Sequence, residues 1–318
     1  MAKDRYLQAL RGLAISAVVL IHCLPQCAAS VAIRPFLNFS VALFLFLSGV
    51  LTDERKFNAG GGLRRRISKV AGPYAFWSVI YLAAFPRPSY ASGFLAFAVG
   101  SVSAQMYYLL VYSQLVLLTP VLFRLLSRYR FFVYCVTPAC LLLRELAAVA
   151  GIALPLIQVF CPMWLIFYVF GLDWRRWAAL IEGRTTQLVA VLFIFLIIQE
   201  VAGFWWYLTG DFNMATTQLK LGPAATSLAV IALLMAVPGS FKSRLSSTLL
   251  VDLGNASFGI YLCHILVLKA VWKLLGLFVI PLGVSTFAVW ALTLAGSYSL
   301  VSLCGRYLPE RIHIIVGL

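Results

Sequence analysis

Charge is scarce in this chain. Charged residues make up 11% of its 318 positions, and Asp and Glu together number only 10, whereas about a quarter of the residues in an ordinary soluble domain are charged. Hydrophobic residues reach 63% of the chain, and the mean hydropathy is +0.96. This composition excludes an ordinary soluble globular protein and predicts a polytopic membrane protein.

Recognisable metal motifs are absent as well. The sequence contains no CxxC pair, no HExxH motif and no cluster of carboxylates, so metal dependence is not expected. Cysteine occurs in an odd number, which argues against a disulfide framework. The seven cysteines fall mainly within apolar segments, where they behave as small hydrophobic residues: Cys23, Cys27, Cys135, Cys140, Cys161, Cys263 and Cys304.

No linker divides the chain, and we expect a single domain over residues 1–318 without a fused periplasmic domain. Apolar runs long enough to cross a bilayer predict an all-α bundle of about ten transmembrane helices around a polar cavity. The ten candidate spans are residues 6–27, 33–51, 70–86, 104–126, 131–150, 155–172, 187–206, 219–237, 255–275 and 280–304. The apolar segment 93–101 is too short to span, so we expect it at the outer interface or in a re-entrant turn.

Basic residues dominate the charge, with 25 Lys and Arg and a formal net charge of +15. They are spread between apolar stretches and form no single basic face, so membrane topology explains them better than nucleic-acid binding. If the amino terminus is cytoplasmic, all but six of them fall in inner segments. The six exceptions are Arg34, Arg87, Arg144, Lys220, Lys269 and Lys273. The bias predicts that both termini are cytoplasmic.

Two ionisable residues, Arg11 and His22, lie inside the first apolar segment, LQALRGLAISAVVLIHCL. Eleven helical residues make about three turns, so both side chains share one helix face, about 16 Å apart along the axis. Such residues are expensive in hydrocarbon, which favours an inward-facing functional role. The alternative is a snorkelling arginine and a histidine used for packing. The segment also imitates a secretory signal, but we expect it to be retained because a second span follows within a few residues.

A basic cluster follows the glycine-rich stretch at residues 58–62. It contains four cations within six residues: Arg64, Arg65, Arg66 and Lys69. The cluster could anchor the chain beside anionic lipid head groups. Alternatively, it could bind a phosphorylated cofactor, because arginine presents a fork of donors that suits phosphate.

Several motifs occur in the order and spacing of the membrane acyltransferase family 3 proteins, which the chain resembles from residue 5 to about 304. The family has an Arg-x10-His first helix and an F-F-x-x-S-G-x-x-L second helix. The matching segments here are Tyr6–Ala14 with His22, Val41–Leu51, Pro73-Tyr74 after the basic loop, Met106–Leu109, Phe167–Gly171 and Ser257–His264.

The resemblance implies an integral enzyme of the bacterial inner membrane. Such an enzyme takes an acyl group, usually acetyl, from cytoplasmic acyl-coenzyme A and places it on a hydroxyl of a surface or lipid-linked glycan. By this resemblance His22 is the catalytic histidine and Arg11 its essential partner, which we assign to the cofactor path. Arg65, Arg66 and Lys69 match the coenzyme-binding loop. Two positions depart from the family pattern: Lys69 stands where arginine is usual, and Tyr107 replaces the more frequent tryptophan.

The chemistry suits these residue types. A neutral histidine can accept the proton of an attacking hydroxyl, which contributes roughly 10²- to 10⁴-fold. The oxyanion needs a donor, for which Ser48, Tyr107 and a backbone amide near Gly49 are candidates. His264 shares a helix face with Ser257 and could form an acceptor-side wall, act as a second acid or base, or simply pack.

Other side chains and other functions stay open. Glu145 and Glu200 could pair with an arginine or contact a sugar, and Trp164 could anchor the chain or stack on a sugar or adenine. A flippase or solute transporter would show a similar composition, although no convincing internal repeat supports it. A non-enzymatic assembly factor is a third interpretation, and it predicts that His22→Ala leaves function intact.

Overall fold

The computed structural model describes residues 4–58, 61–276 and 282–318, and these residues form helices and no β-strand. The main helices are α1 (Arg5–Cys23), α3 (Phe39–Val50), α5 (Gly62–Ala84), α7 (Tyr107–Val149), α10 (Thr185–Leu208), α12 (Leu221–Ala236), α15 (Ser257–Leu275) and α16 (Leu282–Tyr307). Shorter helices connect them: α2 (Ala28–Ile33), η1 (Arg34–Phe36), α4 (Glu54–Asn58), α6 (Tyr90–Ala98), η2 (Ile157–Val159), η3 (Cys161–Met163), α8 (Leu165–Leu172), α9 (Trp174–Ile181), α11 (Phe212–Thr216), α13 (Gly239–Leu245), α14 (Thr248–Asn255) and α17 (Glu310–Val316).

In the described part of the chain, seven helical stretches are long and apolar enough to cross a membrane, which confirms a polytopic all-α protein. They are Arg5–Cys23, Ala28–Val50, Tyr107–Val149, Thr185–Leu208, Phe212–Ala236, Ser257–Leu275 and Thr286–Tyr307. The helix α7 has 43 residues and bends at Tyr129, where the backbone leaves the helical region (φ −129°, ψ 35°). It therefore includes most of two predicted spans, 104–126 and 131–150, and the count of ten is approximate.

Two predicted spans are helical but fall outside these seven stretches. The segment 70–86 lies in α5, whose first two turns carry the basic cluster. The segment 155–172 contains η2 and η3 and ends in α8, a helix of only eight residues. Pro155 and Pro162 interrupt it, because proline lacks the backbone N–H that a continuous helix needs.

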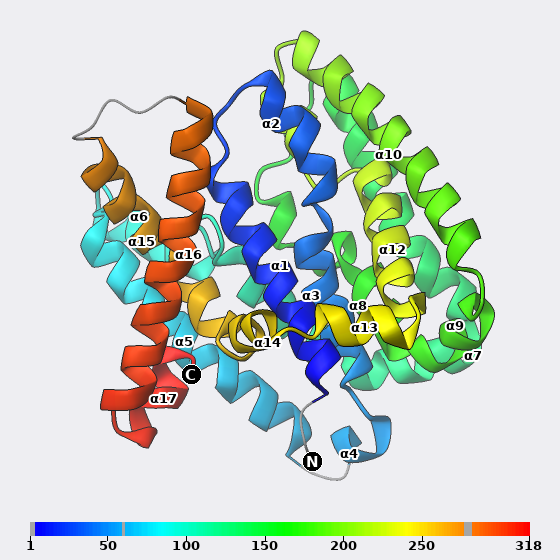
Figure 1. The fold of residues 1–318 in the computed structure, drawn as a ribbon, viewed down its shortest axis with the longest axis horizontal. Helices are drawn as coiled ribbons and strands as arrows, with labels where there is room; N and C mark the ends of the chain where they lie inside the picture. Colours follow the sequence, from blue (N-terminus) through cyan, green and yellow to red (C-terminus); the bar gives the residue numbers. More distant parts are fainter. Residues whose placement is uncertain (1–3, 59–60, 277–281) are drawn as a thin grey trace.

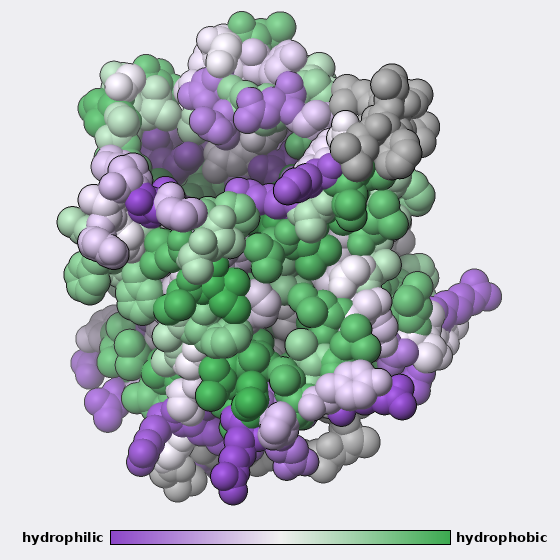
Figure 2. Space-filling view, turned by 90° about the vertical axis from the view of Figure 1, so that its left-hand side faces the viewer, coloured by the Kyte–Doolittle hydropathy of each residue, from purple (hydrophilic) through white to green (hydrophobic). Residues whose placement is uncertain are grey.

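The long helices run between two polar ends. Figure 1 shows both termini at the same end, together with α13, α14 and α17, while α1 rises toward the opposite end and leads into α2. Figure 2 shows a broad apolar belt between hydrophilic side chains at either end. Exposed apolar side chains such as Phe193, Ile194 and Ile197 of α10 suit a lipid-facing surface. The shared end of the termini agrees with the charge distribution; its cytoplasmic location stays a prediction.

Two helix pairs meet at glycines, where backbones touch. A Cβ atom at Gly12 of α1 would lie 2.0 Å from a backbone oxygen of α14, and one at Gly254 of α14 would lie 1.9 Å from a backbone oxygen of α1. The same holds for α3 and α8, where the distances are 2.3 Å for Gly49 and 2.1 Å for Gly171. Only glycine permits such close approach, so these contacts fix the positions of α1 and α3.

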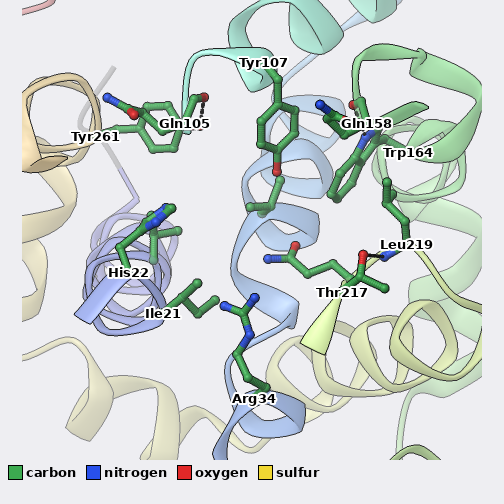
Figure 3. Close-up of a pocket in the computed structure, with 13 residues that line it drawn as sticks. Ile21, His22, Arg34, Gln105, Tyr107, Gln158, Trp164, Thr217, Leu219 and Tyr261 are labelled. Atoms are coloured by element: carbon green, nitrogen blue, oxygen red, sulfur yellow. Dashed lines mark hydrogen bonds between the residues drawn. The ribbon is translucent and has the colours of Figure 1, made fainter. Parts of the chain in front are cut away.

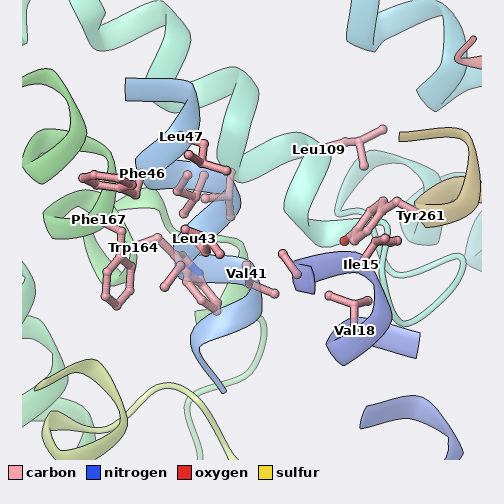
Figure 4. Close-up of a cluster of buried hydrophobic side chains, with 14 of the residues drawn as sticks. Ile15, Val18, Val41, Leu43, Phe46, Leu47, Leu109, Trp164, Phe167 and Tyr261 are labelled. Carbon is pink, nitrogen blue, oxygen red and sulfur yellow. The ribbon is translucent and has the colours of Figure 1, made fainter. Parts of the chain in front are cut away.

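The buried core lies where α1, α3, α7, α8 and α15 converge (Figure 4). Ile15, Leu43, Leu109, Phe167 and Tyr261 come from these five helices and are nearly or fully inaccessible. Close-packed side chains of this kind allow little movement. The packing therefore holds α1, which carries His22, and α3, which carries Ser48, in fixed positions.

Candidate active site

His22 lines a cavity of about 200 Å³, which we call the His22 cavity. It is lined by Val18, Ile21, His22, Arg34, Val41, Gln105, Tyr107, Gln158, Trp164, Thr217, Gln218, Leu219 and Tyr261. His22 belongs to the last turn of α1, so the cavity lies toward the end of the bundle opposite the two termini (Figure 1). The lining combines an imidazole, a guanidinium, amides and aromatic rings.

Tyr107, at the start of α7, shares this cavity with His22. Figure 3 shows its hydroxyl pointing into the space between His22 and Trp164. The rings of Tyr107 and Trp164 stack, with centroids 5.8 Å apart and an angle of 28° between the planes. Stacking fixes the phenol ring and leaves its hydroxyl directed at the cavity. The structure thus brings together His22 and one of the predicted oxyanion donors.

His264 is fully buried beside His22 but does not line the cavity. The centroids of the two imidazole rings lie 5.2 Å apart. The Nδ1 atom of His264 lies 2.8 Å from the carbonyl oxygen of Tyr261 and 3.1 Å from that of Ile260, so Nδ1 carries the proton and donates it. Its Nε2 is buried without a hydrogen-bond partner among the described residues. The structure thus places His264 beside His22 and outside the lining of the cavity.

Arg11 lines a second cavity, of about 410 Å³, which we call the Arg11 cavity. It is lined by Gln8, Arg11, Phe44, Ser48, Arg66, Lys69, Val70, Tyr108, Leu109, Tyr112, Gly254, Asn255, Ser257, Phe258, Tyr261, Ile314, Gly317 and Leu318. Two cations of the basic cluster, Arg66 and Lys69, therefore join Arg11, together with Ser48; the cluster is helical and belongs to α5 rather than to a loop. Arg65 is exposed and outside this lining.

Arg66 is held in place at the end of α3. Its guanidinium donates to the Thr52 hydroxyl (2.6 Å) and to the carbonyl oxygen of Leu51 (3.1 Å), and it lies over the ring of Phe57, 5.6 Å from the centroid. Arg11 makes a longer contact, 3.4 Å, with the side-chain oxygen of Gln8. The start of α5, which carries the basic cluster, is thereby attached to the end of α3 beside the Arg11 cavity.

Tyr261 of α15 lines both cavities. Its hydroxyl donates to the carbonyl oxygen of Gln105 (2.5 Å). The side chain of Gln105 donates to the hydroxyl of Tyr81 (2.8 Å), which donates in turn to the carbonyl oxygen of Leu262 (2.8 Å). This buried network holds Tyr261 between the two cavities. Arg11 and His22 therefore lie in different cavities, as their separation along α1 predicts.

The segment between α11 and α12, which lines the His22 cavity with Thr217, Gln218 and Leu219, is attached to neighbouring helices. Arg144 of α7 donates to the carbonyl oxygen of Leu219 (2.8 Å). Glu145 accepts from the backbone N–H of Leu221 (2.5 Å) at the start of α12, a favourable place for a carboxylate. Glu145 thus binds backbone at the edge of the site.

Several lining residues could not be identified in the sequence as part of the site. They are Arg34, Gln105, Gln158, Gln218 and Tyr261, which come from five separate parts of the chain. Arg34 offered a signal, since it is a cation at the border of a span and outside the inner segments. The glutamines offered none, because each lies in a connection whose path only the fold defines.

Comparison with known proteins agrees with the resemblance seen in the sequence. A family model described as an acyltransferase domain matches residues 4–305, nearly the whole chain. Among curated proteins and among solved structures, none matches this chain. All seven cysteines are free thiols, and the described residues include no group of three or more His, Cys, Asp or Glu that could hold a metal ion.

Proposed function

We propose that this chain, which belongs to acyltransferase family 3, moves an acetyl group from acyl-coenzyme A to a hydroxyl of a cell-surface or lipid-linked glycan. The observation that supports this best is the pair of cavities that share Tyr261. One is rich in cations and the other contains His22, amides and aromatic rings. We place the enzyme in the bacterial inner membrane with both termini cytoplasmic, so that the Arg11 cavity faces the side where acyl-coenzyme A is made.

The Arg11 cavity suits a phosphorylated donor. Arg11, Arg66 and Lys69 contribute cations, and the described lining contains no Asp or Glu side chain. Guanidinium groups bind phosphate oxygens through paired hydrogen bonds, whereas an ammonium acts as a point charge. We assign Arg11 and Arg66 to the phosphates of the coenzyme, with Lys69 adding charge and the exposed Arg65 attracting the coenzyme at the mouth.

The His22 cavity suits the acceptor. Amide groups of Gln158 and Gln218 can bind sugar hydroxyls, and the ring of Trp164 offers a face on which a sugar can stack. His22 then accepts the proton of the acceptor hydroxyl while the hydroxyl oxygen attacks the thioester carbonyl. The carbon–sulfur bond breaks, and the departing sulfur takes up the proton from His22.

Tyr107 is the better of the two side-chain candidates for stabilising the oxyanion. Its hydroxyl points into the His22 cavity, whereas Ser48 lines the Arg11 cavity. Removal of one oxyanion donor costs about 10²- to 10³-fold in kcat in well-studied enzymes. We therefore propose that Ser48 contacts the bound acyl-coenzyme A. Tyr107 donates a hydrogen bond to the oxyanion that forms at the thioester carbonyl.

The test is acyl transfer by purified protein in nanodiscs with radiolabelled acetyl-coenzyme A and a glycan extract of the cell envelope. We expect His22→Ala to lower labelling of glycan at least about 100-fold, within the range for general base catalysis, while coenzyme binding persists. Arg11→Ala should weaken coenzyme binding itself. His313→Ala is the matched control, because His313 lies in α17 and lines neither cavity. Equal labelling by wild type and His22→Ala would contradict the proposal.

A further inference from the structure

Arg34 brings a positive charge into the His22 cavity. Its Nε donates to the carbonyl oxygen of Thr216 (3.2 Å), which fixes the orientation of the guanidinium. Figure 3 shows the group pointing into the cavity, on the side where Ile21 and Thr217 lie. The Nη1 and Nη2 atoms make no hydrogen bond to any other described residue. Two donors of a rigid fork are therefore available to a ligand.

The charge of Arg34 has no counterion within the described chain. No Asp or Glu is among the described residues that line the His22 cavity, and the ion pair between Arg130 and Asp173 lies elsewhere and does not involve Arg34. Arg34 is half-buried; charges withdrawn from water in proteins are normally paired, and unpaired ones inside a membrane protein mark ligand or ion sites. The missing partner of Arg34 is therefore expected to be an anionic group.

One further polar atom of the cavity lining is also unsatisfied. The side-chain oxygen of Gln218 is buried without a hydrogen-bond partner among the described residues, and Gln158 presents its amide to the same space (Figure 3). A ligand that satisfies Gln218 and pairs with Arg34 needs a hydrogen-bond donor, such as a hydroxyl, as well as a negative charge, because buried polar atoms are rarely left unpaired. Sugar hydroxyls together with one anionic substituent meet both requirements.

We propose that the acceptor is an acidic glycan and that Arg34 binds its carboxylate or phosphate while His22 acts on a neighbouring hydroxyl. The inference rests on the proposed function, since it names the substrate class of the same site. A guanidinium fork binds carboxylate and phosphate in the same bidentate way. The anionic group can therefore be the carboxylate of a uronic acid or the phosphate that links a sugar to a lipid, and binding experiments separate these two sources.

The first experiment measures equilibrium binding to the whole protein in nanodiscs. The probes are a glucuronic-acid oligosaccharide, a short-chain prenyl-phosphate glucose and a neutral glucose oligosaccharide of the same length. We expect one or both acidic probes to bind about tenfold or more tightly than the neutral one, since hydrogen bonds to charged groups are the strong ones. Equal binding of all three probes by wild type would overturn the proposal, whatever the variants do.

Variants of Arg34 test whether its guanidinium is the group that binds the anion. Arg34→Gln should lose the preference for the acidic probe, and Arg34→Lys, which retains the charge without the fork, should keep part of it. Arg87→Gln is the matched control, because Arg87 is exposed, lies outside both cavity linings and donates to the carbonyl oxygen of Ser101. Unchanged coenzyme binding shows that the variants fold. An Arg34→Gln protein that folds and binds the acidic probes as wild type does would refute the role of Arg34.

Failure of this inference can be told apart from failure of the proposed function. If an acidic probe binds in a manner that depends on Arg34 but no acetyl group is transferred from acetyl-coenzyme A, the acidic ligand is supported and the proposed enzyme activity is refuted. If the protein transfers acetyl groups to neutral glycans and Arg34→Gln does not change this transfer, the proposed enzyme activity is supported and the acidic acceptor is refuted.

Discussion

Replacing Gly49 with alanine tests the closest contact between α3 and α8. A Cβ atom at this position would lie 2.3 Å from the carbonyl oxygen of Tyr168, 2.8 Å from the backbone nitrogen of Leu172 and 2.9 Å from the Cα of Gly171. All three atoms belong to the backbone of α8, so no side-chain rotation can make room. Because Ser48 and Val41 on α3 line the two cavities, movement of α3 disturbs both.

The size of the effect follows from the distances. Ordinary contact needs more than 3.4 Å, so α3 and α8 must separate by roughly 1 Å, a gap that already forfeits part of every dispersion contact between them. Overpacking of this kind costs typically about 1–3 kcal/mol. If the loss falls on the unfolding barrier, the half-life at a fixed elevated temperature shortens by about fivefold to a hundredfold.

The assay follows the loss of monodisperse protein in detergent with time at one temperature, by size-exclusion chromatography with fluorescence detection. Gly305→Ala is the control, because Gly305 lies in α16 with nothing within 4 Å of its added Cβ. Removing an exposed helix glycine gains up to about 1 kcal/mol, so this variant should be at least as stable as wild type. Equal half-lives for Gly49→Ala and Gly305→Ala would refute the close contact.

Three further predictions use other contacts. Gly12→Ala places its Cβ 2.0 Å from a backbone oxygen of α14 and should shorten the half-life in the same assay. Tyr107→Phe should lower kcat of acyl transfer about 100-fold with little change in KM for the coenzyme, measured by thiol release. Cys27 should react with a membrane-impermeant maleimide in intact cells, because the hydrogen bond with Ser30 lowers the pKa of its thiol, whereas the buried Cys23 should not.

Each of these has an outcome that would contradict it. A Gly12→Ala protein as long-lived as wild type would show that α1 and α14 are not in backbone contact. A Tyr107→Phe enzyme with an unchanged kcat would show that the hydroxyl of Tyr107 does not stabilise the oxyanion. Labelling of Cys27 only after the cells are broken open would place the His22 end of the bundle on the cytoplasmic side.

The helices that the sequence predicted best are those in which hydropathy and backbone chemistry agree. The span 187–206 became α10 (Thr185–Leu208) and the span 255–275 became α15 (Ser257–Leu275). The span 155–172 did not become one helix, because its composition is apolar while Pro155 and Pro162 interrupt the hydrogen-bond ladder. Hydropathy measures transfer to lipid and does not register such interruptions.

The candidate site was predictable where its residues share one helix or fall in the motifs of the family. Arg11 and His22 were visible because the helical period places both on one face of α1. Gln158, Gln218 and Arg34 reach the His22 cavity from connections far apart in the sequence, and no local pattern records where those connections meet. The placement of Ser48 also depends on the fold, since the side on which it lies is set by how α3 packs on its neighbours.

Helix α1 sets the geometry between the two proposed substrates. It carries Arg11 in one cavity and His22 in the other, and a helix of fixed rise keeps them about 16 Å apart. The backbone contact at Gly12 is adjacent to Arg11, and the contact at Gly49 is adjacent to Ser48. Rigid contacts beside these side chains keep the two cavities in a fixed relation. In the function that we propose, the donor therefore extends toward Tyr261 to reach the acceptor, because α1 cannot shorten the distance between its two ends.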